Sequence, residues 1–128
     1  MTLMLVLGAC AARGPDWNGV AVDPMTTSAV PVQASAQSDI YELSDSKVIR
    51  EALAALPEGQ SISEAIGWSN ARTGSLGDIQ SVEERNDEGV LCRTFTTSRE
   101  TFEGVSLYYG ESCRSPSGAW WMRRFEPA

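Results

Sequence analysis

Three cysteines are the residues of this sequence with the clearest chemistry. Cys10 follows the tripeptide Leu-Gly-Ala (residues 7–9) at the end of a short apolar run, whereas Cys92 and Cys113 lie in the second half of the chain. The chain has no histidine, which removes the Ser-His-Asp and Cys-His nucleophile systems and the common zinc-ligand sets. The chemistry to be explained is therefore that of thiols, which form disulfides or carry covalent modifications.

The carboxylates form no acid–base pair and no metal-binding pattern. Glu83 and Glu84 are adjacent, so in a strand they would point to opposite faces. Asp87 and Glu88 lie beside a turn, without the spaced ligands of a calcium loop. The segment 72–77, RTGSLG, lacks the Gly-Lys-Ser/Thr ending of a phosphate-binding loop. We therefore predict that the protein is not an enzyme and that it uses no cofactor, metal ion or small-molecule substrate.

The charge balance argues against two classes of partner. The 128 residues include 17 acidic and 10 basic ones, which gives a formal net charge of −7. Proteins that bind nucleic acid carry a basic surface that releases counterions from phosphates, and docking on anionic lipid needs clustered lysine and arginine. No apolar run reaches the roughly 18 residues of a transmembrane helix. We expect neither a nucleic-acid partner nor a transmembrane helix.

One amphipathic helix is predicted ahead of a series of strands. The apolar residues of its stripe recur at helical spacing and are Ile49, Ala52, Leu53 and Leu56. Pro57 and Gly59 end this pattern. The helix is therefore expected over about residues 44–56, with the stripe packed on a sheet.

Beyond Gly59 the apolar residues alternate with a period of two, which indicates half-buried strands. The strand-like runs are 62–68, 78–86, 90–97, 104–113 and 119–126. A helix followed by strands predicts an α+β domain, in which one N-terminal helix packs on an antiparallel sheet of about four to five strands. Turns are expected at 70–77 and 87–89, where glycine, asparagine and aspartate gather.

Cys92 and Cys113 lie in two strands that read as one hairpin. If they face each other, Thr94 lies opposite Glu111 and the hairpin closes near residues 101–104. A cross-strand disulfide fits this register, and its loop entropy would contribute about 3 kcal/mol to the stability of a small domain. The alternative is two unpaired, buried thiols in a reducing cytosol.

The first 39 residues divide into two parts. Residues 1–9, MTLMLVLGA, have the length of the apolar core of an export signal. No lysine or arginine precedes this core, so either the beginning of the signal is missing or the segment is an N-terminal strand. Residues 10–39 contain Pro15, Pro24 and Pro31 and have no apolar period, which predicts a disordered or extended tether. The globular domain is then expected over 40–128.

The sequence Leu7-Gly8-Ala9-Cys10 resembles a lipobox, at which lipoprotein signal peptidase cleaves. Cys10 would then become the first residue of the mature chain and carry a diacylglyceryl group, palmitate being a typical acyl chain. Several acyl chains together give stable anchoring. This hypothesis also explains why Cys10 is left over if the other two cysteines pair. Since the following residue is alanine and not aspartate, the outer membrane is favoured over inner-membrane retention.

The second half of the chain resembles the 17-kDa surface-antigen lipoproteins of Gram-negative bacteria. Over roughly residues 45–126 it has the same order of a Trp-x-Asn and Thr-Gly turn, two Cys-Arg strands and a Gly-x-Trp strand. The residues that carry this resemblance are Trp68, Asn70, Thr73, Gly74, Cys92, Arg93, Cys113, Arg114, Gly118 and Trp120. The resemblance implies an outer-membrane lipoprotein whose domain has no established catalysis. Some family members carry a Gly-rich segment before the domain; here a polar spacer replaces it, which leaves periplasmic and surface-facing orientations open.

Four residues are candidates for an interaction surface: Arg93, Arg114, Tyr108 and Trp121. In the predicted register the two arginines lie on the sheet face opposite to the disulfide, where they either bind a partner or form ordinary surface pairs. Neighbouring aromatic residues in a strand point to opposite faces, so one member of each Tyr-Tyr and Trp-Trp doublet is expected to be exposed. Exposed tyrosine and tryptophan are typical of binding surfaces.

Two functional hypotheses follow. The first is a non-catalytic outer-membrane lipoprotein, anchored through Cys10, with a structural or protein-interaction role in the cell envelope and an envelope protein as partner. The alternative is a soluble periplasmic binding module or enzyme inhibitor that acts through the exposed aromatic and arginine face. Only the first requires lipid on Cys10.

Overall fold

The computed structural model describes residues 30–60 and 62–128. The predicted signal peptide (1–9), Cys10 and the first part of the predicted tether lie outside the described residues. The elements in chain order are α1 (Val30–Ala54), β1 (Ile66–Asn70), β2 (Ser75–Asp87), β3 (Val90–Thr101), β4 (Gly104–Arg114) and β5 (Trp120–Pro127). Within the described residues, no helix has both the length and the apolar character needed to cross a membrane.

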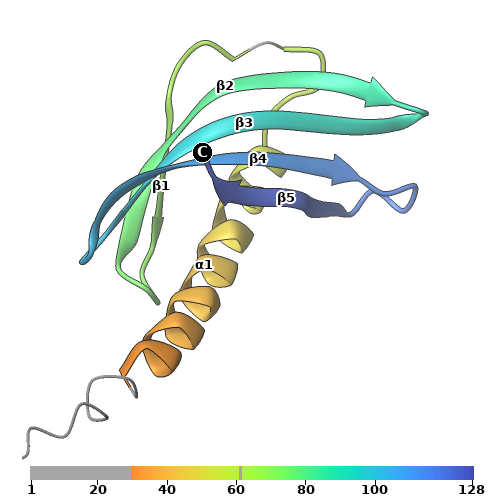
Figure 1. The fold of residues 1–128 in the computed structure, drawn as a ribbon. Helices are drawn as coiled ribbons and strands as arrows, with labels where there is room; N and C mark the ends of the chain where they lie inside the picture. The colour runs from red at the N-terminus through yellow and green to blue at the C-terminus, as the bar shows by residue number, and fades with distance from the viewer. Residues whose placement is uncertain (1–29, 61) are drawn as a thin grey trace, which may run out of the picture.

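The five strands form one antiparallel sheet in the order β1-β2-β3-β4-β5, so each strand pairs with its neighbours in sequence. The predicted α+β fold is therefore confirmed. Helix α1 crosses one face of the curved sheet, and no other element of the described residues covers the opposite face (Figure 1). We call the covered face the helix face and the uncovered one the open face.

The helix is longer than predicted. It begins at Val30, not near residue 44, and ends at Ala54. The prediction of a disordered or extended tether is therefore wrong for residues 30–39, which belong to the helix. Pro31 is compatible with this helix because it lies in the first turn, where a missing N–H has no helical partner to lose.

Several strand boundaries also differ from the prediction, and β3 runs on to Thr101, beyond the predicted end at 97. Strand β1 begins at Ile66, and Ile62 pairs with β2 only through an isolated bridge to Val82. Strand β2 begins at Ser75, three residues before the predicted start, because the turn closes early. The amide of Gly74, whose φ is 74°, donates to the carbonyl of Asn70 at 2.8 Å and completes this turn.

The core lies between α1 and the helix face. Its buried members are Ile49 and Leu53 from the helix and Trp68, Ile79, Val82 and Phe95 from the sheet. The two helical residues belong to the predicted stripe, which is therefore confirmed as the buried side of the helix. The sheet positions that point into the core alternate along each strand, so the adjacent positions point to the open face.

Gly110 leaves the space that the Phe95 ring occupies. The two residues face each other across β3 and β4, and a Cβ added at Gly110 would lie 2.1 Å from the ring. Since Phe95 is held in the core, we expect Gly110→Ala to lower the free energy of unfolding by about 1–3 kcal/mol. Urea denaturation measures the change. Gly67→Ala is the control, because its added Cβ would meet only Asp78 Oδ1, at 3.7 Å; equal losses in the two variants would contradict the packing.

Candidate functional site

A fully buried carboxylate, Asp45 of α1, lies at the centre of a polar cluster. Its Oδ1 accepts hydrogen bonds from Asn70 Nδ2 at 2.8 Å and from Thr73 Oγ1 at 2.6 Å. Its Oδ2 accepts one from Arg99 Nε at 2.8 Å. Asn70 and Thr73 of the family-like motif thus fasten the helix to the β1–β2 turn. The acid is engaged on both oxygens, which suits a structural role better than proton transfer.

The other motif residues of this region also serve the fold. The indole N–H of Trp68 donates to Thr97 Oγ1 at 2.9 Å inside the core. Gly74 and Gly118 adopt positive φ angles of 74° and 89° in the turns before β2 and β5, a conformation that glycine adopts without a steric penalty. Trp120 packs on the helix face beneath a guanidinium group whose carbon lies 4.5 Å from the ring centroid.

That guanidinium belongs to Arg93, which is only 1% exposed. It donates to the carbonyls that end the helix, those of Leu53, Leu56 and Pro57. Its Nε and one Nη also donate to Glu84 Oε2, each at 3.1 Å. The side chain therefore caps carbonyls at the C-terminal end of α1 and in the turn that follows it. The hypothesis that Arg93 forms part of an interaction surface is wrong, because the end of α1 covers it.

Tyr108 is also buried, at 5% exposure. Its hydroxyl donates to Glu42 Oε2 at 2.9 Å, and its ring stacks on Phe125 with centroids 4.6 Å apart. Burial, reinforced by the hydrogen bond to Glu42, raises the pKa of the Tyr108 phenol above its ordinary value. The prediction of an exposed Tyr108 is therefore wrong. Glu42 lies in the part of the helix that the sequence did not predict. This part of α1 covers the sheet at Tyr108.

The remaining two candidates are accessible but do not share a face. Trp121 is 45% exposed and lies on the open face, where it pairs with Cys113 across β4 and β5. Arg114 is partly exposed on the helix face, where its guanidinium pairs with Glu58 and approaches the Trp120 ring. The predicted aromatic and arginine face is therefore not assembled: its four members divide between two sides of the sheet.

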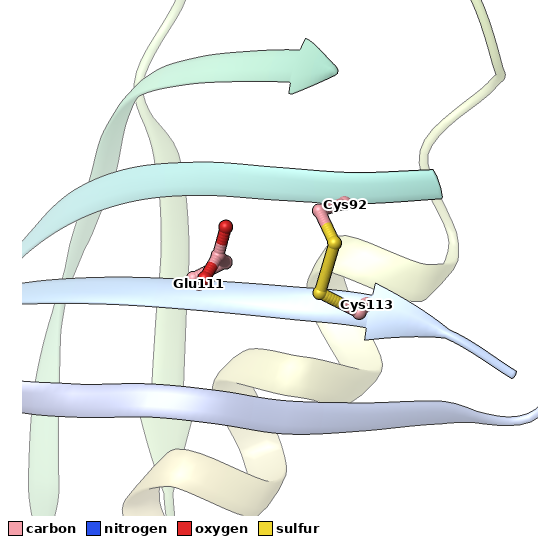
Figure 2. A group of neighbouring side chains, drawn as sticks. All are labelled: Cys92, Glu111 and Cys113. Atoms are coloured by element: carbon pink, nitrogen blue, oxygen red, sulfur yellow. A yellow bond between two sulfur atoms is a disulfide. The ribbon is translucent and has the colours of Figure 1, made fainter. Parts of the chain in front are cut away.

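The disulfide between Cys92 and Cys113 is confirmed, and so is the predicted hairpin register. Figure 2 shows the bridge crossing from β3 to β4 with the Glu111 carboxylate beside it. The two sulfur atoms and a carboxylate oxygen lie within 4.8 Å of one another, a spacing that metal ligands can have. In the oxidised protein, however, the sulfurs are bonded to each other, and Glu111 accepts a hydrogen bond from Arg85. Sequence reasoning missed this role of Glu111.

Removal of this disulfide has a measurable cost. We expect the double variant Cys92→Ala/Cys113→Ala to lose about 3 kcal/mol of unfolding free energy, because the bridge closes a chain loop and restricts the unfolded chain. Chemical denaturation with and without a reductant measures the loss. The reductant should lower the stability of the wild type and leave the double variant unchanged. A wild type that is insensitive to full reduction would contradict the assigned contribution.

Two hollows lie outside the hydrogen-bonded clusters. A groove of about 450 Å³ lies between α1 and β5, with Glu42 in its wall. A hollow of about 600 Å³ lies beside the β2–β3 and β4–β5 turns, with Arg114 and Trp120 in its wall. Glu42 is held by Tyr108 and Arg114 by Glu58, so these two groups are already engaged within the chain. Asp39, Arg123 and Arg124 also line the groove.

The open face carries a feature that sequence reasoning did not assemble. Exposed apolar side chains gather towards the end formed by the β1–β2 and β3–β4 turns: Leu76, Phe102, Val105, Leu107 and Tyr109. The alternation of β4 could have indicated them, since residues 105, 107 and 109 share one face. The sequence could not show that α1 packs on the opposite face of the sheet and leaves these side chains exposed.

Comparison of the chain with models of protein families, with characterised proteins and with solved structures finds no match in any of the three. The resemblance to the 17-kDa surface-antigen lipoproteins therefore stays a prediction. So do the lipid anchor and the outer-membrane location. Function has to be argued from the residues and their geometry.

Proposed function

We propose that this chain is a non-catalytic lipoprotein of the bacterial cell envelope, anchored in the outer membrane through Cys10, whose domain has a structural or protein-interaction role. The observation that carries the proposal is the pairing of the other two cysteines. Because Cys92 and Cys113 bond to each other, Cys10 is left as the odd cysteine directly after Leu7, Gly8 and Ala9. A leftover cysteine in an exported protein needs a role of its own, and acylation at a lipobox provides one.

The compartment is supported by the disulfide. Disulfides persist in oxidising surroundings such as the bacterial periplasm and are rare in the cytosol. The bridge is fully buried between two central strands of the sheet, as expected for a structural bond. An exported protein is consistent with both the bridge and the apolar run that precedes Cys10.

A non-catalytic role is supported by the use of the buried polar groups. In the part of the chain that the structure describes, every buried side-chain nitrogen or oxygen atom has a hydrogen-bond partner. Asp45, Arg93 and Arg99 are each committed to fastening α1 to the sheet. Catalytic groups, in contrast, are kept accessible to a substrate. The alternative of a soluble binding module loses support, because Arg93 and Tyr108 are buried.

Membrane partition tests the proposal. In a Gram-negative host, the wild type should enter the detergent phase after extraction and take up a labelled fatty acid, whereas Cys10→Ser should do neither. The double variant Cys92→Ala/Cys113→Ala is the matched control, since it should still be labelled if it accumulates. Absence of label on a wild-type protein found in the periplasmic fraction would contradict the anchor and favour the soluble module.

A further inference from the structure

The open face of the sheet carries a cluster of exposed apolar side chains, which we call the apolar patch. Its members are between 43% and 85% exposed and are Leu76, Phe102, Val105, Leu107 and Tyr109. Phe102 lies in the β3–β4 turn, and the other four lie on strands. Larger apolar clusters of this kind on a protein surface mark interaction sites.

The strand register brings the patch together. Glu100 of β3 pairs with Leu76 on one side and with Val105 on the other, so the three form one row across the sheet. Leu107 and Tyr109 follow on the same face of β4. Helix α1 lies on the opposite face (Figure 1), so within the described residues no helix covers the patch.

The exposed charges at this end of the sheet are mainly acidic, with Arg72 of the β1–β2 turn exposed there as well. Asp78, Glu100 and Glu103 are exposed at this end of the sheet, and none of them forms an ion pair within the described part of the chain. Arginines of the open face lie towards the other end, where Arg85 pairs with Glu111 and Arg123 with Asp87. Acidic side chains therefore lie within the patch and beside it. Glu100 stands between Leu76 and Val105, and Asp78 and Glu103 are exposed next to the row.

We propose that the apolar patch docks an amphipathic helix of a partner protein, with apolar residues along one stripe and lysine or arginine on both sides of it. The apolar stripe would cover Leu107 and Val105, and the basic side chains would reach the neighbouring acids at the ends of their flexible stems. A partner helix on the open face would give the sheet a helix on each side, as α1 already covers the helix face. The proposal rests on the interaction role proposed above and names its surface and the chemistry of the partner.

Two other occupants fit less well. A second copy would bring the same acidic residues against one another, and the whole chain carries a net charge of −7; like charges across an interface oppose association. An anionic lipid surface is repelled by the same acidic residues. Charge complementarity therefore favours a basic protein segment.

A designed peptide tests the patch directly. The probe is a short, dye-labelled peptide of leucine and lysine patterned as an amphipathic helix, titrated into the full-length chain and followed by fluorescence anisotropy. Saturable binding that weakens as salt is raised is expected. The same peptide with glutamate in place of lysine should not bind. Because the readout does not involve Cys10, a failure here is distinguishable from a failure of the lipid anchor.

Variants locate the binding. Leu107→Ser and Glu100→Lys should each weaken the affinity by about tenfold, which corresponds to roughly 1.4 kcal/mol. The matched controls are Leu43→Ser, an exposed leucine of α1, and Glu64→Lys, an exposed acid far from the patch; both should bind as the wild type does. Equal loss in patch and control variants, binding of the glutamate peptide, or dimerisation through the patch without peptide would each overturn the proposal.

Discussion

Replacing Arg99 by methionine is expected to lower the free energy of unfolding by about 3–5 kcal/mol, because it leaves a buried carboxylate without its counter-charge. Asp45 is completely buried, and its Oδ2 has Arg99 Nε at 2.8 Å as its charged partner. Removing one member of a buried pair leaves the desolvation cost of the other uncompensated. Equilibrium denaturation in urea measures the loss.

Arg124→Met is the matched control for this effect. Arg124 is an arginine of the same sheet, 55% exposed, and its nearest acid, Glu126, lies 3.8 Å away. Exposed pairs of this kind contribute little, so the unfolding free energy of the control should stay within about 0.5 kcal/mol of the wild type. Comparable losses at the two positions would contradict a special role for the Asp45 cluster.

Replacing Arg93 by methionine is expected to cost about 2–4 kcal/mol of unfolding free energy, because several buried acceptors lose their donor at once. The carbonyls of Leu56 and Pro57 would lose this donor, and the Leu53 carbonyl would keep only the Leu56 amide. Glu84 would lose the partner that holds it with two hydrogen bonds. Arg93→Lys should recover only part of the loss, since a single ammonium group cannot replace the planar fork of donors.

The control for Arg93 is Arg114→Met. Both arginines follow a disulfide cysteine and both approach Trp120, but the side chain of Arg114 is 36% exposed and its partner Glu58 is 58% exposed. Its loss should be small. If Arg93→Lys were as stable as the wild type, the assignment of Arg93 as the cap of α1 would be refuted.

The register of the β3–β4 hairpin could be predicted from the sequence because one assumption fixes it. Once Cys92 faces Cys113, every other pair of the hairpin follows, and the structure has Thr94 opposite Glu111 as expected. The buried side of α1 was predictable for a similar reason, since Ile49 and Leu53 have helical spacing and few other positions of the segment are apolar.

The burial of Arg93 could have been found, although it was not. Arg93 lies two residues before Phe95, so the two side chains share a face of the strand, and Phe95 is the large apolar residue expected to face the core. The burial of Tyr108 was harder to predict, because strand alternation shows which residues share a face but not how far a helix extends over it. The helix extends back to Val30, and Pro31 lies in its first turn, where a missing N–H has no helical partner to lose.

The measurement that tests the central claim most directly is the intact mass of the mature protein, purified from fractionated membranes of a Gram-negative host. The account predicts a chain that begins at Cys10 and carries the mass of its acyl chains, with one disulfide between Cys92 and Cys113. Cys10→Ser should lose both the added mass and the membrane association. An unmodified Cys10, in a chain that still contains residues 1–9, would contradict the lipid anchor.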